Sequence, residues 1–451
     1  MALAGCGGEA DPGTTAQSAG ASTQAVASGY EIDCSLFDQF GDLTGTTVTA
    51  TAHGAPTTSD VPLWRPFEAC TGTDVQMEGT EATYVDADAD LLMRLASGEP
   101  PDVTFLSQVG QLTALIEQTG AVVPVFDETR PLVQQGFDDG LLRYATVDGD
   151  LYGFPHGLGS VKSLVWYSPA AFADAGYEVP ETWEELIALS DRIVSDNPDG
   201  SVKPWCAGIA SGDATGWPLT DWVEDVMLRA QGADYYDAWV DHDVPFNAPE
   251  SLDVWETVGS ILRNPAYVNG GVGDVASIAS TGFEDSGLPI LQGTCLMTKM
   301  PSFYVSANWP DGVTFAPDGD LYAFYLPAMQ ATSGKPILAA AEYVAAVQDR
   351  PEVRAFMTYL ASADYVNLAA REVEVFISPH RGLDIDNVAS PIGRLVVELL
   401  RDPAAIIRHD GSDVMPGQVG AGTFWREGTA WISQGMETQA VLDAIEESWP
   451  Q

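Results

Sequence analysis

Hydrophobic positions in the N-terminal part of the chain alternate between the two-residue period of strands and the longer period of helices. In residues 86–97, for example, Leu91, Leu92 and Leu95 share one face of a predicted helix, and Gly-Glu-Pro-Pro-Asp at 98–102 ends it. We predict strands at 46–50, 74–78 and 103–106 and helices at 61–70 and 86–97. This alternation predicts an α/β lobe with a largely parallel sheet, in which ligands bind at the loops after the strands.

A second segment with the same alternation begins after residues 148–155. Its first helix has a capping box, because Thr182 lies at the N-cap position and Glu185 follows three residues later. An aromatic-rich region then extends from Trp205 to Trp255. We predict a strand at 162–167, a helix opening at 180–186, a strand region at 334–346 and helices at 351–360 and 439–448.

The chain is strongly acidic. Among 451 residues, 65 are Asp or Glu and 19 are Lys or Arg, which gives a formal net charge of -46 at pH 7. This charge excludes nucleic acid as a partner, because phosphate backbones need a basic surface, and it disfavours anionic membranes. The length and the 45% of hydrophobic residues indicate a globular protein of two or three lobes.

Lysine is rare even among these few cations, with four residues in the chain: Lys162, Lys203, Lys299 and Lys335. A solvated acidic surface with little lysine is typical of proteins adapted to high salt, which screens their self-repulsion. An acidic extracytoplasmic protein from a source that prefers arginine to lysine explains the same composition. The sequence leaves both interpretations open.

The N-terminus carries a pattern for lipid attachment. Leu-Ala-Gly-Cys at residues 3–6 resembles a bacterial lipobox, in which Cys6 becomes the lipidated first residue after signal cleavage. The expected basic and apolar regions of a signal peptide are absent before it. A segment rich in Ala, Gly, Ser and Thr follows and is typical of a flexible tether. We expect lipidation at Cys6 with a tether over 1–45; the alternative is an ordinary disordered N-terminus.

Neither a metal site nor a membrane span is predicted. The sequence has no C-x-x-C or H-E-x-x-H spacing, and we expect no metal and no cofactor. Three aspartates within residues 86–90 lack the glycine and distal glutamate of a calcium loop, so they fit the acidic start of a helix. The apolar run at 336–347 is interrupted by Glu342, and no run reaches the length of a membrane span.

Several motifs together resemble one known family. The general motifs are at 98–103 (Gly-Glu-Pro-Pro-Asp-Val), 152–155 (Tyr-Gly-Phe-Pro), 166–168, 180–186 and 422–425 (Gly-Thr-Phe-Trp), and the more specific ones are at 204–206, 213–222 and 267–271. They resemble the extracellular solute-binding proteins of ABC importers, in the sugar-binding group that includes the maltose-binding type. The last three motifs are similar to the α-glucoside-binding branch, and the resemblance covers the chain after the tether.

The resemblance implies the two-lobed periplasmic-binding-protein fold of type II (Venus flytrap), an α/β fold whose lobes each have a mixed, mainly parallel sheet flanked by helices. Crossing strands form a hinge, and ligand bound between the lobes favours the closed form. We expect the first lobe to comprise 46–155 and 316–372, and the second lobe 156–315 and 373–451.

Four cysteines remain besides Cys6, and an even number outside the cytoplasm suggests two disulfides. Sequence alone allows three pairings. We favour Cys34–Cys70 and Cys206–Cys295, because each pair then falls within one predicted lobe.

A sugar needs aromatic platforms for its C–H face and fixed hydrogen-bonding groups for its hydroxyls. The loop-like segment 213–222 supplies both, with Trp217 between Gly216 and Pro218. Trp217 and Trp222 are alternatively core residues, and Asp221 is alternatively a helix cap. From the second lobe we expect ligand contacts by Asp213, Trp217, Asp221, Trp222, Ser302, Phe303 and Trp425, the last because the maltose-binding type has a stacking aromatic there.

The remaining candidates for ligand binding follow predicted strands of the first lobe or belong to the C-terminal part. They are His53, Glu81, Gln108 and Arg381. His53 and Glu81 are alternatively solvated side chains, and Arg381 is alternatively half of a structural ion pair.

By this resemblance the chain is a non-catalytic, extracellular or periplasmic lipoprotein that binds an α-glucoside or small α-linked oligosaccharide. We expect a monomer that presents the sugar to the permease subunits and contacts the membrane only through its lipid. Two alternatives stay open at this point. A secreted glycoside hydrolase also needs a cleft, aromatics and two carboxylates, and a receptor for a sensor kinase has the same fold with a different partner.

Overall fold

The computed structural model describes residues 32–53, 61–80, 84–106, 109–269, 272–329, 334–373 and 376–450. The candidate residues Cys6, Glu81 and Gln108, and the side chain of His53, lie outside this description.

The larger of two main sheets forms the first lobe. Its six described strands follow the order β12-β11-β3-β1-β2, with β6 also paired to β11. β1 is parallel to β2 and β3, and β11 is parallel to β12 but antiparallel to β3 and β6. The strands are β1 (Thr47–His53), β2 (Asp74–Thr80), β3 (Val103–Leu106), β6 (Gly153–Val161), β11 (Lys335–Ala346) and β12 (Ala405–His409).

The smaller sheet belongs to the second lobe and has the described order β10-β7-β9-β8. Two of its pairings are antiparallel and one is parallel, so the expectation of a mainly parallel sheet does not hold here. The reason is that the chain enters this lobe along β7 and leaves it along β10, so these two neighbouring strands run in opposite directions. Its strands are β7 (Leu164–Tyr167), β8 (Lys203–Trp205), β9 (Cys295–Lys299) and β10 (Tyr322–Tyr325), and a short hairpin of β4 (Thr146–Val147) and β5 (Asp150–Leu151) lies apart.

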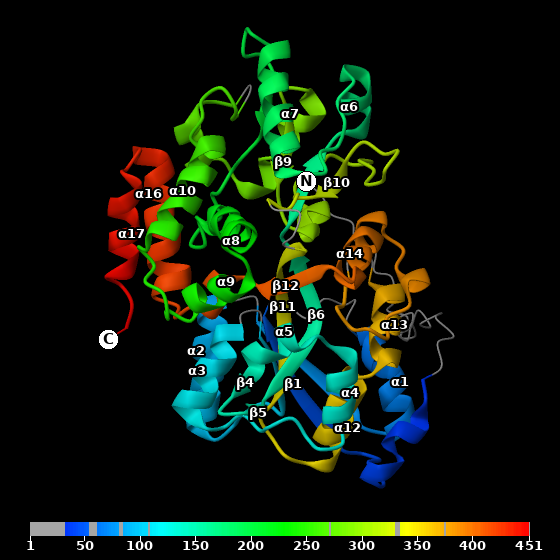
Figure 1. Ribbon diagram of the computed structural model, residues 1–451. Helices are drawn as coiled ribbons and strands as arrows, with labels where there is room; N and C mark the ends of the chain where they lie inside the picture. Colours follow the sequence, from blue (N-terminus) through cyan, green and yellow to red (C-terminus); the bar gives the residue numbers. More distant parts are fainter. Residues whose placement is uncertain are drawn as a thin grey trace, which may run out of the picture.

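Helices surround both sheets, as expected for this α/β class (Figure 1). In the first lobe they are α1 (Val61–Thr71), α2 (Tyr84–Ser97), α3 (Val109–Thr119), α4 (Arg130–Gly136), α5 (Asp139–Leu142), α12 (Pro351–Leu360), α13 (Ala363–Glu372) and α14 (Pro391–Arg401). In the second lobe they are α6 (Pro169–Ala175), α7 (Trp183–Asp196), α8 (Trp217–Gln231), α9 (Ala233–Val240), α10 (Pro249–Leu262), α11 (Leu288–Gln292), α15 (Gly411–Val414), α16 (Trp425–Gln434) and α17 (Thr438–Glu446).

The start of α7 shows how local sequence sets an element. Thr182 Oγ1 accepts a hydrogen bond from the Glu185 amide at 3.2 Å, and Glu185 Oε2 accepts one from the Thr182 amide at 3.1 Å. The predicted capping box is therefore confirmed, and it satisfies two amides that a bare helix end would leave without partners.

The chain passes between the lobes three times: from β6 to β7, from β10 to β11, and from β12 to α15. β6 and β11 run through the middle of the molecule (Figure 1). Two segments lie in a different lobe from the expected one. β10 belongs to the smaller sheet, and residues 376–409 pack on the first lobe, where Ile377, Leu383 and Val388 join its core and β12 pairs with β11.

Both favoured disulfides are confirmed. Cys34–Cys70 joins the 3-10 helix η1 (Cys34–Phe40) to α1, and Cys206–Cys295 joins the segment after β8 to β9, with Cα atoms 5.3 and 5.6 Å apart. The expectation of a tether over 1–45 is wrong for residues 34–45, because this first disulfide and the burial of Phe37 and Leu43 fix them to the first lobe. Among the described helices, none is long and apolar enough to cross a membrane.

Candidate functional site

A cavity of 550 Å³ lies where elements of the second lobe face the crossing strands β6 and β11. Its walls differ in chemistry, with aromatic rings on the second lobe and small or charged side chains on the crossing strands and the segment after β12. The lining residues are Ser160, Lys162, Ser211, Ala214, Trp217, Phe283, Phe303, Ala340, Ala341, Glu342, Asp410, Ser412, Asp413 and Trp425.

Three rings from separate elements form the aromatic wall. Trp217 opens α8, and its ring centroid lies 5.1 Å from that of Phe283 and 5.9 Å from that of Phe303. Phe283 and Phe303 come from short 3-10 helices, η4 (Phe283–Asp285) and η5 (Ser302–Ser306). Phe303 is 38% exposed although it is a large apolar side chain. Exposed aromatic surface inside a cavity is typical of a binding site.

Trp425 adds a fourth ring, which is placed by an unusual backbone contact. It follows a π-helical turn (Val419–Phe424) and begins α16. Gly216, with φ of +118°, lies so close that a Cβ there would be 2.6 Å from the Trp425 carbonyl oxygen. A side chain at this position is excluded both by the contact and by the backbone angle. Gly216 thus holds the start of α8, and with it Trp217, against Trp425.

The wall opposite the rings belongs to β6 and β11. Ala340 pairs with Ser160 in the ladder, and Glu342, two residues further along β11, lines the same cavity. The alanines at 339–341 carry only methyl groups, which leaves room between this wall and the aromatic rings. Glu342 is the carboxylate of this wall, and His156 Nδ1 lies 3.2 Å from its Oε2.

One lysine connects the two lobes at the base of the cavity. Lys162 follows β6, and its Nζ lies 2.8 Å from Asp221 Oδ1 and also pairs with Asp410. The same ammonium lies 5.5 Å from the ring centroid of Trp217. Burial by itself lowers the pKa of Lys162, but Asp221 and Asp410 outweigh it, so that the pKa is raised well above its ordinary value.

The carboxylates around Lys162 respond to burial differently. Burial raises the pKa of Asp221 to about 7, even though Lys162 opposes this shift. Burial acts against ionisation of Asp410 as well, but there Lys162 and hydrogen bonds from neighbours prevail and lower the pKa. Burial and the charge of Asp410 raise the pKa of Glu224, whose carboxyl accepts hydrogen bonds from the amides of Gly411 and Ser412.

Three of the predicted site residues, Trp217, Phe303 and Trp425, line the cavity. Other candidates from the second lobe have structural partners in place of cavity contacts. Asp221 pairs with Lys162, and Trp222 packs edge-on against Trp205 at 5.2 Å. The buried Ser302 Oγ accepts a hydrogen bond from the Val161 amide at 3.0 Å. Asp213 is exposed on the loop before α8 and lies outside the lining set.

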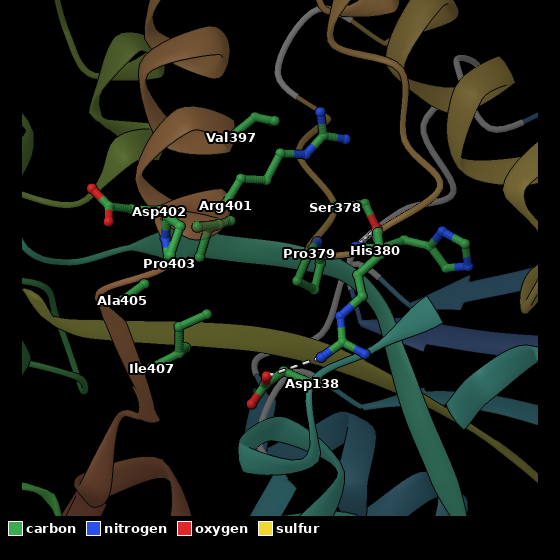
Figure 2. Close-up of a pocket in the computed structure, with 12 residues that line it drawn as sticks. Asp138, Ser378, Pro379, His380, Val397, Arg401, Asp402, Pro403, Ala405 and Ile407 are labelled. Atoms are coloured by element: carbon green, nitrogen blue, oxygen red, sulfur yellow. Dashed lines mark hydrogen bonds and ion pairs between the residues drawn. The ribbon is translucent and has the colours of Figure 1, made fainter. Parts of the chain in front are cut away.

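Arg381 lies at a different cavity, of 410 Å³, beside α14 and β12 (Figure 2). It is 58% exposed and forms an ion pair with Asp138 at 3.2 Å, which fits the structural alternative considered for it. Asp138 and Arg401 lie at different sides of this cavity (Figure 2). Among the described residues that line it, none is Trp, Tyr or Phe, so it offers no platform for stacking.

Several cavity residues were missed by the sequence analysis: Lys162, Phe283, Glu342, Asp410, Ser412 and Asp413. Glu342 had a usable signal, because it is a lone carboxylate within an apolar run. Lys162 also had a usable signal, because it is one of only four lysines in the chain and begins the strand predicted at 162–167. The acidic residues after β12 had no such signal, since nothing in the sequence distinguishes them from the rest of the 65 Asp and Glu residues.

This arrangement suits a small molecule with an apolar face and a rim of hydroxyl groups. Rings stack on the face, and carboxylates and hydroxyls bind the rim. Within the described residues there is no group of three or more His, Cys, Asp or Glu placed to hold a metal.

Comparison with known proteins agrees with this geometry. Residues 51–367 match the family described as bacterial extracellular solute-binding protein. The chain is 40% identical over 388 residues to the "Osmoprotective compounds-binding protein GgtB" of Synechocystis sp., which covers 85% of this chain and 87% of that protein. It is 36% identical over 396 residues to the "Alpha-glucosides-binding periplasmic protein AglE" of Rhizobium meliloti, covering 85% and 82%.

The fold is also found in solved structures. The apo form of RafE from Streptococcus pneumoniae superimposes with a TM-score of 0.70 at 16% identity, over 90% of this chain and 97% of that one. The family and the relatives are binding proteins of transporters, which excludes the hydrolase alternative. The chain belongs to the bacterial extracellular solute-binding proteins, the sugar-binding family 1 of ABC transporters, and is not an enzyme.

Proposed function

We propose that this protein is the substrate-binding lipoprotein of an ABC importer and binds an α-glucoside or a small α-linked oligosaccharide in the 550 Å³ cavity. The single observation that carries the proposal is the pairing of Trp217 and Trp425 on one wall with Glu342 and Ser160 on the other. Indole faces take up the C–H face of a glucose ring, and the opposite wall takes up its hydroxyls.

Two relatives support this ligand class. One is named for osmoprotective compounds and the other for α-glucosides. A glucoside of a small polyol belongs to both classes. A ring with a short hydroxylated substituent also suits the cavity, since four aromatic rings and several polar groups surround one space.

Closure of the lobes is the signal that we propose the permease reads. Elements of both lobes line the cavity, so a ligand between them makes more contacts when the lobes approach. The three chain crossings lie beside the cavity and provide the hinge. A ligand shifts this equilibrium only by its difference in affinity for the open and closed forms.

The anchor and the assembly state complete the proposal. Lipidation of Cys6 places a monomer at the outer face of the cell membrane, and the residues before η1 serve as the tether. Metabolic labelling of the expressed precursor with a radioactive fatty acid tests this part, with Cys6→Ser as the control. Label in the wild type that is lost in Cys6→Ser supports the anchor, and an unlabelled wild type contradicts it.

The ligand class is tested by a thermal-shift panel at high and low salt with glucose, maltose, trehalose, sucrose, glucosylglycerol and xylose. A ligand at one hundred times its dissociation constant stabilises the folded state by about 2.7 kcal/mol. A rise with one or more α-glucosides, and none with xylose, supports the proposal. A flat panel contradicts the α-glucoside assignment.

A further inference from the structure

The strand β11 is irregular at one point, which lies in the wall of the cavity. Its register with β6 shifts between Ala340 and Glu342 and again between Glu342 and Tyr343. On the other edge, β12 pairs with β11 only up to Ala339, and β3 pairs with it from Tyr343 onward. Residues 340–342 therefore pair with neither β12 nor β3 on one edge, and on the other edge the pairing with β6 is irregular from Ala341 to Glu342. Such irregularities typically re-aim a side chain next to a functional site.

The open edge at this point is closed by a histidine. The Ala341 amide donates a hydrogen bond to His409 Nε2 at 3.2 Å. Because a backbone amide only donates, Nε2 is the unprotonated nitrogen of that ring. Burial lowers the pKa of His409, which keeps the ring neutral. The irregular segment is thus held in place by a buried, fully hydrogen-bonded side chain.

The carboxylate of Glu342 is fixed by a second chain of hydrogen bonds. His156 Nδ1 lies 3.2 Å from Glu342 Oε2, and Tyr365 Oη hydrogen-bonds to His156 Nε2. With Nδ1–H donating to the carboxylate, the tyrosine hydroxyl donates to Nε2. Glu342 Oε1 has no hydrogen-bond partner among the described residues. A carboxylate oriented at one oxygen and open at the other is well prepared to accept hydrogen bonds from a ligand.

The charges that line the cavity indicate which ligands it rejects. Among the described lining residues, three are carboxylates (Glu342, Asp410 and Asp413) and one is a cation (Lys162). The cation is already paired with Asp410 and with Asp221. Glu342 is 31% exposed, and among the residues that the structure describes it pairs with His156 and with no arginine or lysine. A ligand carboxylate next to it faces like-charge repulsion in a partly dry cavity.

We propose that Glu342 is the specificity-determining acceptor of this site, which binds hydroxyl groups of neutral glycosides and excludes anionic ones, with His156 as its positioning residue. This deepens the proposed function and rests on it. The bulge aims the carboxylate, the His156–Tyr365 chain orients it, and the Trp217 and Trp425 rings face it across the cavity. The rings bind the apolar face of the sugar, and Glu342 discriminates against ligands that carry a negative charge.

The test is isothermal titration calorimetry of the full chain with three probes: glucosylglycerol and maltose as neutral glycosides, and glucosylglycerate as an anionic one. In glucosylglycerate a carboxylate replaces a hydroxymethyl group of glucosylglycerol. We expect the wild type to bind a neutral probe at least 100-fold more tightly than glucosylglycerate. In Glu342→Gln we expect the affinity for the neutral probe to fall roughly 10- to 150-fold, the range for a hydrogen bond to a charged group. The ratio of the affinities for the neutral probe and for glucosylglycerate should become smaller.

A matched control is Glu284→Gln, which removes the same charge from an exposed residue next to Phe283 but outside the cavity lining. It should leave both affinities unchanged. His156→Gln alone should lower the affinity for the neutral probe. Added to Glu342→Gln, it should lower that affinity no further. A merely structural histidine would weaken both backgrounds alike.

The outcomes separate the inference from the function on which it rests. If the wild type binds no neutral glycoside in this assay or in the thermal-shift panel, the proposed function is wrong. If it binds a neutral probe and Glu342→Gln binds that probe equally well, the inference is wrong and the function stands. Equal affinity of the wild type for glucosylglycerol and glucosylglycerate also overturns the inference.

Discussion

Lys162 Nζ lies 2.8 Å from Asp221 Oδ1 in the interior of the protein, at the point where the chain first passes from one lobe to the other. Lys162 follows the crossing strand β6, and Asp221 lies in the first turns of α8, the helix that begins with Trp217. The pair therefore ties the hinge to the aromatic wall of the cavity. Asp410, which follows β12, binds the same ammonium and joins the third crossing to this cluster.

Removing the charge of Lys162 should destabilise the protein strongly. In Lys162→Met, Asp221 and Asp410 lose their shared cation in a buried position, and breaking a buried pair costs about 3–5 kcal/mol. We expect a fall of this size in the free energy of unfolding measured with urea. Lys335→Met is the matched control, because its ion pair with Asp402 is partly exposed, at 43% and 25%, and should contribute at most about 1 kcal/mol. Equal effects of the two substitutions would contradict the role of the cluster.

Each of the two indoles should contribute to ligand affinity without being needed for the fold. In Trp217→Ala and Trp425→Ala the ligand loses a stacking surface worth about 1–3 kcal/mol, or roughly 5- to 150-fold in Kd. Calorimetry with the sugar identified in the thermal-shift panel measures this. Trp449→Ala is the control, because that ring stacks on His242, away from the cavity. An affinity unchanged in both cavity variants would show that the ligand binds elsewhere.

Gly216→Ala should damage the site through the backbone. The new Cβ collides with the Trp425 backbone and requires an unfavourable positive φ. We expect a loss of about 1–3 kcal/mol in unfolding free energy and weaker sugar binding, since the start of α8 must move. Gly200→Ala isolates the cost of the backbone angle, because Gly200 has φ of +71° and open space around its Cβ position. If both variants lose equal stability and bind sugar normally, the contact with Trp425 does not position the site.

His380 predicts a pH dependence of stability. Burial lowers its pKa to about 4 in the folded protein, whereas the unfolded chain has the ordinary value near 6.5. The unfolded state thus binds the proton more readily, so stability is complete above pH 6.5 and is lost as the pH falls through 4. The loss from this group is about 3 kcal/mol between pH 7 and 4.

His380→Gln should flatten the slope of the unfolding free energy against pH between pH 7 and 4. An NMR titration gives a direct check, since the His380 ring should titrate near pH 4. A midpoint near 6.5 would contradict the assignment.

The elements were predictable where local pattern decides them. The strand expected at 103–106 is β3, and the capping box at Thr182 opens α7 as predicted. The family resemblance supplied the two-lobed arrangement. It also pointed to Trp217 and Trp425, which both line the cavity, because aromatic residues in glycine-rich motifs are visible without tertiary information.

The roles of charged residues were less predictable, because they depend on partners distant in the chain. Asp221 was expected at the ligand, but Lys162, 59 positions away, takes its carboxylate as an ion-pair partner. Glu342 was visible only as an interruption of an apolar run. Its aim follows from a register shift between strands, which is a property of their pairing and not of local propensity.

The location of the bound sugar is best determined by a crystal structure of the protein with the sugar that gives the largest thermal shift. We predict the sugar in the 550 Å³ cavity, with a ring face against Trp217 or Trp425 and a hydroxyl group on Glu342. Density for the sugar in the cavity beside Arg381, or anywhere outside the space between the two lobes, would contradict this account.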